Sequence, residues 1–222
     1  MQSASGGVMQ DQKVYGVLSG KQLPVEPSLP SQANAVRKTL SDCAQLFQTC
    51  QTEVTCPEIG TWHITMSRPE LSLRLALLIR ARLYAEFGLV ARIAIGIGPQ
   101  NGASKSHLAS GLSDRALSHM TSYFDLTGAL PLQTGPLREW MRTLLHLCSG
   151  LAKGWTKRQA EILAQALIMP TATHQQISET LSPPVRKQTV TDSLRGANWR
   201  VLQEALVLFE QTDWQKLITA NC

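Results

Sequence analysis

The sequence has few cysteines and no long apolar run. Its cysteines are odd in number and show neither a CxxC pair nor a Cys/His ligand spacing (Cys43, Cys50, Cys56, Cys148 and Cys222). This pattern excludes a disulfide framework and a zinc site of the usual spacing. No apolar run reaches transmembrane length, and no charged-then-apolar signal segment opens the chain. We therefore expect a cytoplasmic protein with reduced thiols and no membrane partner.

The excess of positive over negative charge in the sequence is also small. Lysine and arginine number 21 against 16 aspartate and glutamate residues, a net charge of +5. Within residues 153–222, eight basic residues stand against six acidic ones, an excess of two. The balance favours a polyanionic partner, but charge alone does not identify a DNA-binding protein.

Residues 173–199 have the pattern of two short helices separated by a break. Thr173 is a suitable N-cap, and Ile177 and Leu181 lie four residues apart on one face. The run Ser182-Pro183-Pro184 ends the first helix, because proline lacks the N–H and clashes with the preceding turn. The second helix turns apolar residues inward (Val185, Val190 and Leu194). This pattern predicts a helix-turn-helix whose second helix enters the major groove of double-stranded DNA.

The outer face of that second helix supplies the predicted DNA contacts. The face carries Lys187, Gln188, Thr191, Asp192 and Arg195, and the predicted contacts are the basic or polar residues on it and just before it (Arg186, Lys187, Gln188, Thr191 and Arg195). Arginine or lysine can bind guanine or phosphate, and glutamine can pair with adenine. Two alternatives stay open. The charges can be merely solvated on a helical domain that never touches DNA, or the motif can contact a partner protein.

The first half of the chain predicts a mixed fold. Short apolar or alternating runs predict strands at 13–18, 53–56, 61–66 and 89–97, and helical spacing predicts helices at 31–51 and 68–87. The order βαββαβ is the split arrangement of an α+β, ferredoxin-like fold, an antiparallel sheet with two helices on one face. Further helices are expected at 112–124, 136–152, 156–168 and 198–210.

These elements divide the chain into four parts. Residues 1–12 are expected to be a mobile tail, 13–135 the α+β domain, 136–155 a connecting helix, and 156–222 the helix-turn-helix domain. The connecting helix carries an apolar stripe (Leu137, Met141, Leu144 and Cys148). The stripe can pack on its own sheet or on a second subunit. A homodimer is expected because helix-turn-helix proteins usually read two half-sites.

Four short landmarks resemble those of the SatD-like bacterial proteins. They are Val17-Leu18-Ser19-Gly20, Gly60-Thr61-Trp62-His63, the run ARIAIGIG at 91–98, and Ser110-Gly111-Leu112-Ser113. The resemblance covers roughly residues 14–209. It implies a domain similar to class III nucleotide cyclases followed by a helix-turn-helix, and hence a transcriptional regulator whose first domain senses a ligand or dimerises.

The chain departs from the cyclase pattern at its metal ligands. Cyclases hold two metal ions with two carboxylates, one at the end of the first strand and one in the central hairpin. Here those places are occupied by Gly20-Lys21 and Gly60-Thr61, with Glu58 the closest acid in the hairpin. We therefore predict a degenerate domain with no catalytic residues, no metal site and no cofactor.

A nucleotide or small-molecule effector is still conceivable from the residue types. Gly96 and Gly98 would admit a phosphate close to the backbone, and Lys21 or Lys105 would pair with it. The run lacks the third glycine of a dinucleotide fingerprint. The alternative function is therefore a nucleotide-binding or nucleotide-modifying enzyme.

Overall fold

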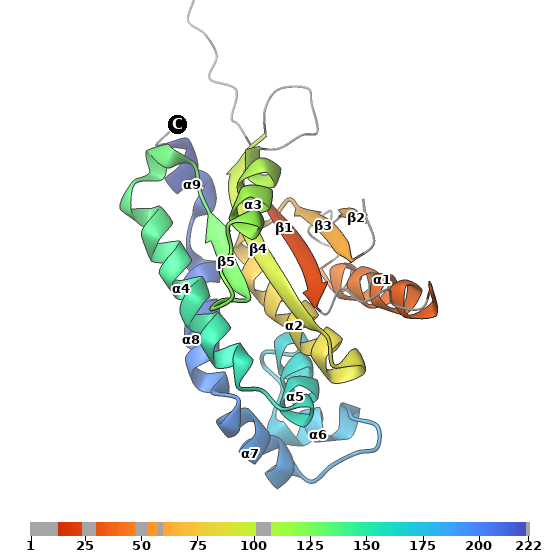
Figure 1. Cartoon of the computed structure of the whole chain (residues 1–222). Coiled ribbons are helices and arrows are strands. Elements are labelled where there is room, and N and C mark those ends of the chain that lie inside the picture. Colours follow the sequence, from red (N-terminus) through yellow and green to blue (C-terminus); the bar gives the residue numbers. More distant parts are fainter. Residues whose placement is uncertain (1–12, 24–29, 48–52, 57–59, 101–107, 221–222) are drawn as a thin grey trace, which may run out of the picture.

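The computed structural model is an α+β protein built on one mixed sheet of five strands. It describes residues 13–23, 30–47, 53–56, 60–100 and 108–220 (Figure 1). In chain order the elements are β1 (Val14–Leu23), α1 (Pro30–Gln45), β2 (Glu53–Thr55), β3 (Thr61–Met66), η2 (Pro69–Leu71), α2 (Ser72–Phe87), β4 (Val90–Pro99), α3 (Leu108–Ser118), β5 (Leu126–Ala129), η3 (Leu132–Thr134), α4 (Pro136–Lys153), α5 (Lys157–Ile168), α6 (His174–Thr180), α7 (Lys187–Gly196), α8 (Trp199–Gln211) and α9 (Trp214–Thr219). The expected mobile tail at 1–12 lies outside the described residues. No helix in the described ranges is both long and apolar enough to cross a membrane.

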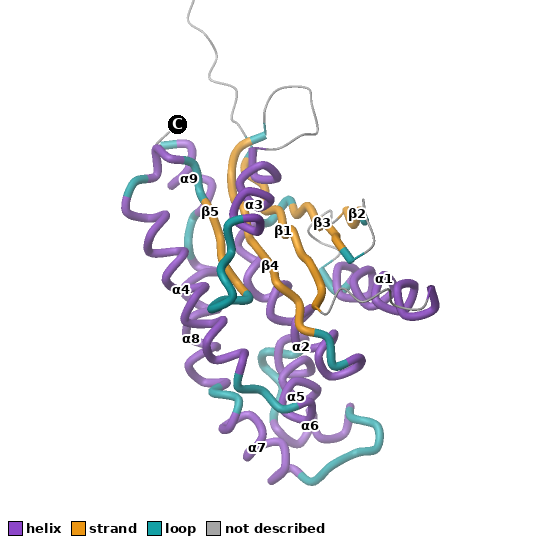
Figure 2. The backbone as a smooth tube through the Cα atoms, viewed as in Figure 1, coloured by secondary structure: helices purple, strands orange, loops and turns teal. Residues whose placement is uncertain are grey.

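The sheet has the strand order β2-β3-β1-β4-β5. β1 is central and pairs antiparallel with β3 and with β4, while β5 pairs parallel with β4 at the other edge (Figure 2). The predicted strands at 53–56, 61–66 and 89–97 are present with small changes at their ends.

β1 is longer than the predicted strand at 13–18, which was expected to end at Ser19-Gly20. The strand runs on to Leu23, with Gly20 opposite Trp62 and Ile93. A Cβ atom on Gly20 would lie 2.0 Å from Cζ2 of Trp62. The glycine is therefore a packing position inside the strand, where it makes room for the indole ring, and the prediction of a strand end there was wrong.

Helices cover both faces of the sheet. Gly16 of β1 lies opposite Ile97 of β4, and its side of the sheet faces η2 and the start of α2. Successive residues of a strand face opposite sides of the sheet, so Gly96, next to Ile97, faces the other side. There α3 approaches so closely that a Cβ atom on Gly96 would lie 2.1 Å from the Ala109 carbonyl oxygen. The prediction of helices on one face alone was therefore incomplete. α3 also begins at Leu108 and ends at Ser118, earlier than the predicted range 112–124.

The C-terminal helices pack directly on the sheet's own helices. α4 runs beside β5, α5 packs on α2, and α9 contacts β1 and β4 (Figure 1). A single cluster of buried apolar side chains continues from the sheet into α5, α7 and α8. Gln215 of α9 accepts a hydrogen bond from the backbone N–H of Val14 at 2.9 Å. The sheet therefore supports the helical part through a shared core.

Candidate functional site

The predicted pair of helices forms as α6 and α7, and local chemistry explains their ends. The Thr173 side chain accepts from the N–H of Gln176, and the Gln176 side chain accepts from the N–H of Thr173, which is a capping box. Ser182, Pro183 and Pro184 lie in the break between α6 and α7. A second capping box at Thr156 and Gln159 starts α5, in agreement with the helix predicted at 156–168. The starts of α5 and α6 and the end of α6 are thus set by residues next to them in the sequence.

The inner face of α7 is apolar and buried. Val190 and Leu194 are almost fully buried, and Ile177 of α6 is buried beside them. α7 packs on both α5 and α6. Val185, the third predicted inward residue, is only partly buried in the turn, where its N–H donates to the Ser178 carbonyl oxygen. This packing leaves the opposite face of α7 free.

The outer face of α7 carries four of the five predicted DNA contacts. Arg186, Lys187, Gln188 and Arg195 are exposed. Thr191 is half-buried, because its hydroxyl donates to the Lys187 carbonyl oxygen and lies 2.9 Å from Nδ1 of His174. The structure therefore places Thr191 beside Lys187 and Arg195 on the helix, with its hydroxyl turned to the start of α6.

An acidic residue that the sequence reading left out of the contact set lies in the middle of this face. Asp192 is exposed, and both of its carboxylate oxygens accept from the Gln188 side-chain amide at 3.1 Å. The Arg195 guanidinium lies 3.5 Å from the same carboxylate. Asp192 thus holds two candidate contact residues and adds a negative charge between them.

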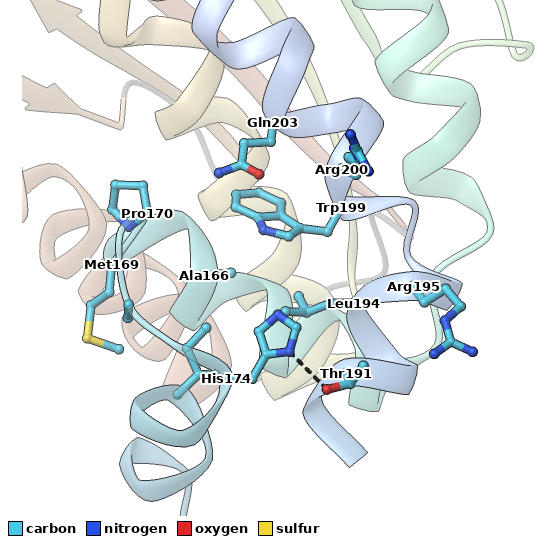
Figure 3. Close-up of a pocket in the computed structure, with 12 residues that line it drawn as sticks. Ala166, Met169, Pro170, His174, Thr191, Leu194, Arg195, Trp199, Arg200 and Gln203 are labelled. Atoms are coloured by element: carbon cyan, nitrogen blue, oxygen red, sulfur yellow. Dashed lines mark hydrogen bonds between the residues drawn. The ribbon is translucent and has the colours of Figure 1, made fainter. Parts of the chain in front are cut away.

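A cleft opens beside α7, between α5, α6 and α8. It has a volume of about 460 Å³, and Trp199, His174 and Met169 contribute to its walls (Figure 3). Arg195 of α7 and Arg200 of α8 also line the cleft. The cationic surface of α7 therefore continues past its C-terminal end onto α8.

The two stretches that the sequence comparison set beside cyclase metal-ligand positions, Gly20-Lys21 and Gly60-Thr61, are adjacent in this structure. The N–H of Gln22 donates to the Gly60 carbonyl oxygen at 3.1 Å, and Lys21 lies opposite Thr61 in the sheet. Neither position carries a carboxylate, and Glu58 lies outside the described residues. Within the described part of the chain, no group of three or more His, Cys, Asp or Glu residues could hold a metal ion. The two stretches thus lie close together and carry no carboxylate.

Among the described residues considered for nucleotide binding, Lys21 lies apart from Gly98. Gly98 lies opposite Tyr15 at one end of β1, and Lys21 lies six residues along, about 20 Å away for an extended strand. Gly96 packs against the backbone of α3, and a Cβ atom on Gly98 would lie 3.3 Å from the Ala109 nitrogen. The two glycines thus make room for a helix of the protein itself, and Lys105 lies outside the described residues.

The apolar stripe of α4 faces the protein's own core. Met141 and Cys148 are almost fully buried, and Leu137 and Leu144 pack partly buried against the same core. A Cβ atom on Gly128 of β5 would lie 2.7 Å from the terminal methyl of Met141, so helix and strand are in close contact. This arrangement matches the alternative in which the stripe packs on its own sheet.

A polar cluster between β1, β3 and α3 was missed by the sequence reading. The Ser19 hydroxyl lies 2.5 Å from an Asp114 carboxylate oxygen, 2.7 Å from the Ser113 hydroxyl and 3.0 Å from Nδ1 of His63. The same His63 nitrogen lies 3.3 Å from Asp114. A catalytic serine triad uses the two ring nitrogens separately, one for serine and one for aspartate. This cluster therefore differs from a triad, and it attaches α3 to the sheet.

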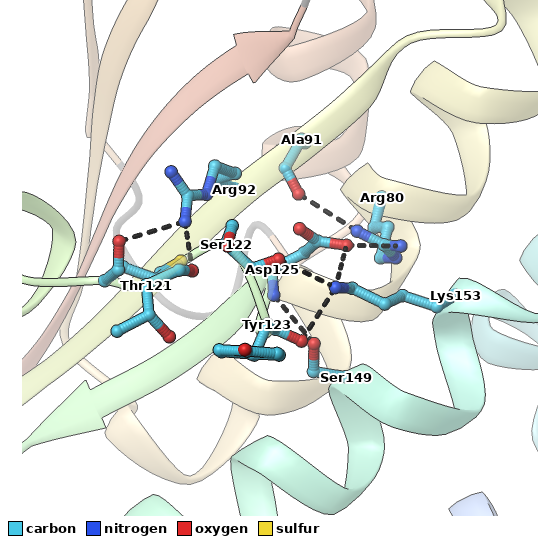
Figure 4. Close-up of polar contacts among 10 residues, drawn as sticks. Arg80, Ala91, Arg92, Thr121, Ser122, Tyr123, Asp125, Ser149 and Lys153 are labelled. Carbon is cyan, nitrogen blue, oxygen red and sulfur yellow. Dashed lines mark hydrogen bonds and ion pairs between the residues drawn. The ribbon is translucent and has the colours of Figure 1, made fainter.

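A second polar network ties the loop before β5 to its surroundings (Figure 4). Arg80 of α2 donates to Asp125 and to the Ala91 carbonyl oxygen, each at 3.1 Å. Burial lowers the pKa of Arg80, and the Asp125 carboxylate opposes that effect. Lys153 at the end of α4 donates to the carbonyl oxygens of Ser122 and Tyr123. The network holds this loop in place between the sheet and α4.

Neither the models of known protein families nor the curated protein sequences contain a match to this chain. Functional inference therefore depends on the geometry described above.

Proposed function

We propose that this chain is a cytoplasmic, sequence-specific DNA-binding regulator in which α6 and α7 form a helix-turn-helix. The observation that carries the proposal is the division of α7 into two faces. Val190 and Leu194 are buried, while Lys187, Gln188 and Arg195 are exposed on the other side. A reading helix must be held from behind and must present donors toward base edges, and the two faces of α7 support that role.

The proposal gives the sheet a non-catalytic role. The order β2-β3-β1-β4, with antiparallel pairing throughout, is the order of a ferredoxin-like sheet, and α1 and α2 supply its two helices. This supports the proposed likeness to cyclase domains, to which β5 and α3 add a further strand and helix. Since the two metal-ligand positions carry no carboxylate, we expect no cyclic nucleotide from ATP or GTP with Mg²⁺. Chromatography of the reaction would reveal one, and robust turnover would favour the nucleotide-enzyme alternative.

We further propose that the protein acts as a homodimer, since two reading helices must meet half-sites about 34–36 Å apart. The stripe of α4 is packed in the core, so such an interface would use other apolar residues that are exposed. Trp140 and Leu147 are exposed on α4, and Val201 and Leu208 are exposed on α8, which contacts α4. A second copy of the chain is the partner that a two-fold arrangement requires.

The DNA-binding proposal is tested by selecting the sequences that the protein binds from a random duplex library. Gel shift then measures the affinity of the protein for the most enriched sequence. Replacing Lys187 and Arg195 together by Ala should weaken that complex by about 1–3 kcal/mol for each lost base contact. The matched control replaces Arg37 and Lys38, which are exposed on α1, by Ala. It should bind as the wild type does.

Two results would count against the proposal. A folded wild-type protein that enriches no sequence would favour the alternative in which the motif contacts a partner protein. Equal affinity of the Lys187/Arg195 variant and the control would move the DNA contact away from α7.

A further inference from the structure

A second cavity lies far from α7, between α3 and α4 and over β5. Its volume is about 640 Å³, within the range of small-molecule sites. Thr127, Gly128 and Ala129 of β5 form its floor, and the two helices flank that strand in Figure 1. The loop held by Lys153 and Arg92 closes one end through Thr121 and Phe124. Its walls are thus ordered elements.

The charged groups of this cavity are mainly cationic. Arg115 of α3 and Arg138 and Arg142 of α4 line it, and its single carboxylate, Glu139, forms an ion pair with Arg142. Among the described residues, Arg115 and Arg138 have no acidic partner. The Nε atom of Arg138 is also buried without a hydrogen-bond acceptor in the described part of the chain. Two guanidinium groups on opposite walls are thus left to bind an anion.

The cavity also offers a flat apolar surface. The rings of Phe124 and His146 stack with their centroids 3.7 Å apart and their planes 7° apart. Nε2 of His146 lies 3.0 Å from the Thr127 hydroxyl, which fixes the ring. Burial, and secondarily the charge of Arg142, lowers the pKa of His146, which favours the uncharged ring. Leu112 and Leu130 add aliphatic surface.

We propose that this cavity binds a small aromatic anion, a planar ring that carries a carboxylate or a phosphate. The ring would lie against the Phe124–His146 stack, where an apolar planar group displaces water. The anionic group would pair with Arg115 and Arg138, whose guanidinium geometry matches carboxylate and phosphate oxygens. The cavity is separate from the Lys21, Gly96 and Gly98 positions, and ligand binding in it does not require that α7 binds DNA.

The test is isothermal titration calorimetry on the full chain without DNA. The two probes are 2-naphthoate, an aromatic carboxylate, and AMP, an aromatic phosphate, and they distinguish the two kinds of anion. The neutral compound 2-naphthalenemethanol has the same ring system as the first probe without its charge. We expect saturable binding of at least one anionic probe and at least about tenfold weaker binding of the neutral compound, the usual size of a charge-assisted hydrogen bond.

Two variants assign the binding to this cavity. Replacing Arg115 and Arg138 by Gln should lower the affinity for the anionic probe about tenfold or more. The control Arg37→Gln on α1 should leave that affinity unchanged. Ala116→Trp keeps the charges but fills the cavity from α3 and should abolish binding, with circular dichroism to confirm the fold. The proposal is overturned if neither anion binds at millimolar concentration. It is also overturned if folded variants bind as the wild type does.

Discussion

Arg74 of α2 and Glu210 of α8 form a two-pronged ion pair inside the protein. Nε and Nη2 of the arginine lie 2.6 Å and 3.1 Å from the two carboxylate oxygens, and Nη1 donates to the Leu167 carbonyl oxygen at the end of α5. The Arg74 side chain is 9% exposed and that of Glu210 is 23% exposed. One arginine thus joins the helix that supports the sheet to two helices of the proposed DNA-binding part.

Removing one partner of this pair should be costly. We expect Glu210→Ala to lower the free energy of unfolding by about 3 kcal/mol, because it leaves a buried guanidinium without its counter-charge. Urea denaturation followed by circular dichroism measures the change. The double change Arg74→Leu with Glu210→Leu should recover most of the loss, since no buried charge remains. The surface pair Arg200–Glu204 is the matched control, and Glu204→Ala should cost less than about 1 kcal/mol.

Asp192 should oppose DNA binding by its charge. Its carboxylate lies on the proposed reading face, where it would approach phosphates, so Asp192→Asn should strengthen binding to DNA of any sequence. The amide can still accept from the Gln188 side chain. Gel shifts at several salt concentrations should give higher affinity for the variant. An unchanged or weaker affinity would mean that Asp192 acts chiefly by positioning Gln188 and Arg195, or that α7 faces no phosphate.

The two sides of α4 should respond differently to a charge. Leu147 is 64% exposed, so the Leu147→Glu variant should fold normally. Light scattering of the wild type should give about twice the mass of one chain. If α4 and α8 form the interface, the variant should instead give the mass of a monomer. Met141→Glu buries a carboxylate and should unfold the protein. Leu46→Glu, at an exposed leucine after α1, is the control and should leave the mass unchanged. A wild-type monomer would contradict the proposed dimer.

Cys148 should make the protein less stable at high pH. Burial raises the pKa of its thiol to about 11 from an ordinary value of 9.0. Below pH 9 the Cys148 thiol keeps its proton in both the folded and the unfolded state. Between the two pKa values the thiol ionises in the unfolded chain but stays protonated in the folded protein. The free energy of unfolding should therefore fall as pH rises, by about 2 kcal/mol at about pH 10.5 from this group.

Urea denaturation of wild type and Cys148→Ala at neutral and high pH separates this effect from other titrations. The variant should lose less stability between the two pH values, although it starts lower because of the missing side chain. Identical pH dependence would show that the Cys148 thiol ionises equally in both states.

Local sequence determined the helices of the C-terminal part to within a few residues. Capping by Thr156 and Thr173 and the αL conformation of Gly88 after α2 depend on neighbouring residues alone. The two-faced character of α7 follows from the spacing of Val190 and Leu194 along one helix. The apolar run at 89–97 predicted β4, which spans Val90–Pro99, because a buried strand needs apolar side chains on both faces.

Tertiary structure alone decided what the glycines and the buried polar groups do. Gly20 and Gly96 look like a strand end and a phosphate loop in the sequence, yet the first accommodates Trp62 and the second accommodates α3. Ser19 meets His63 and Asp114 across 44 and 95 residues, and Arg74 meets Glu210 across 136. The cavity between α3 and α4 likewise joins side chains from separate elements. Such contacts depend on how the sheet orders its strands and on which helix covers each face, and no short stretch of sequence contains that information.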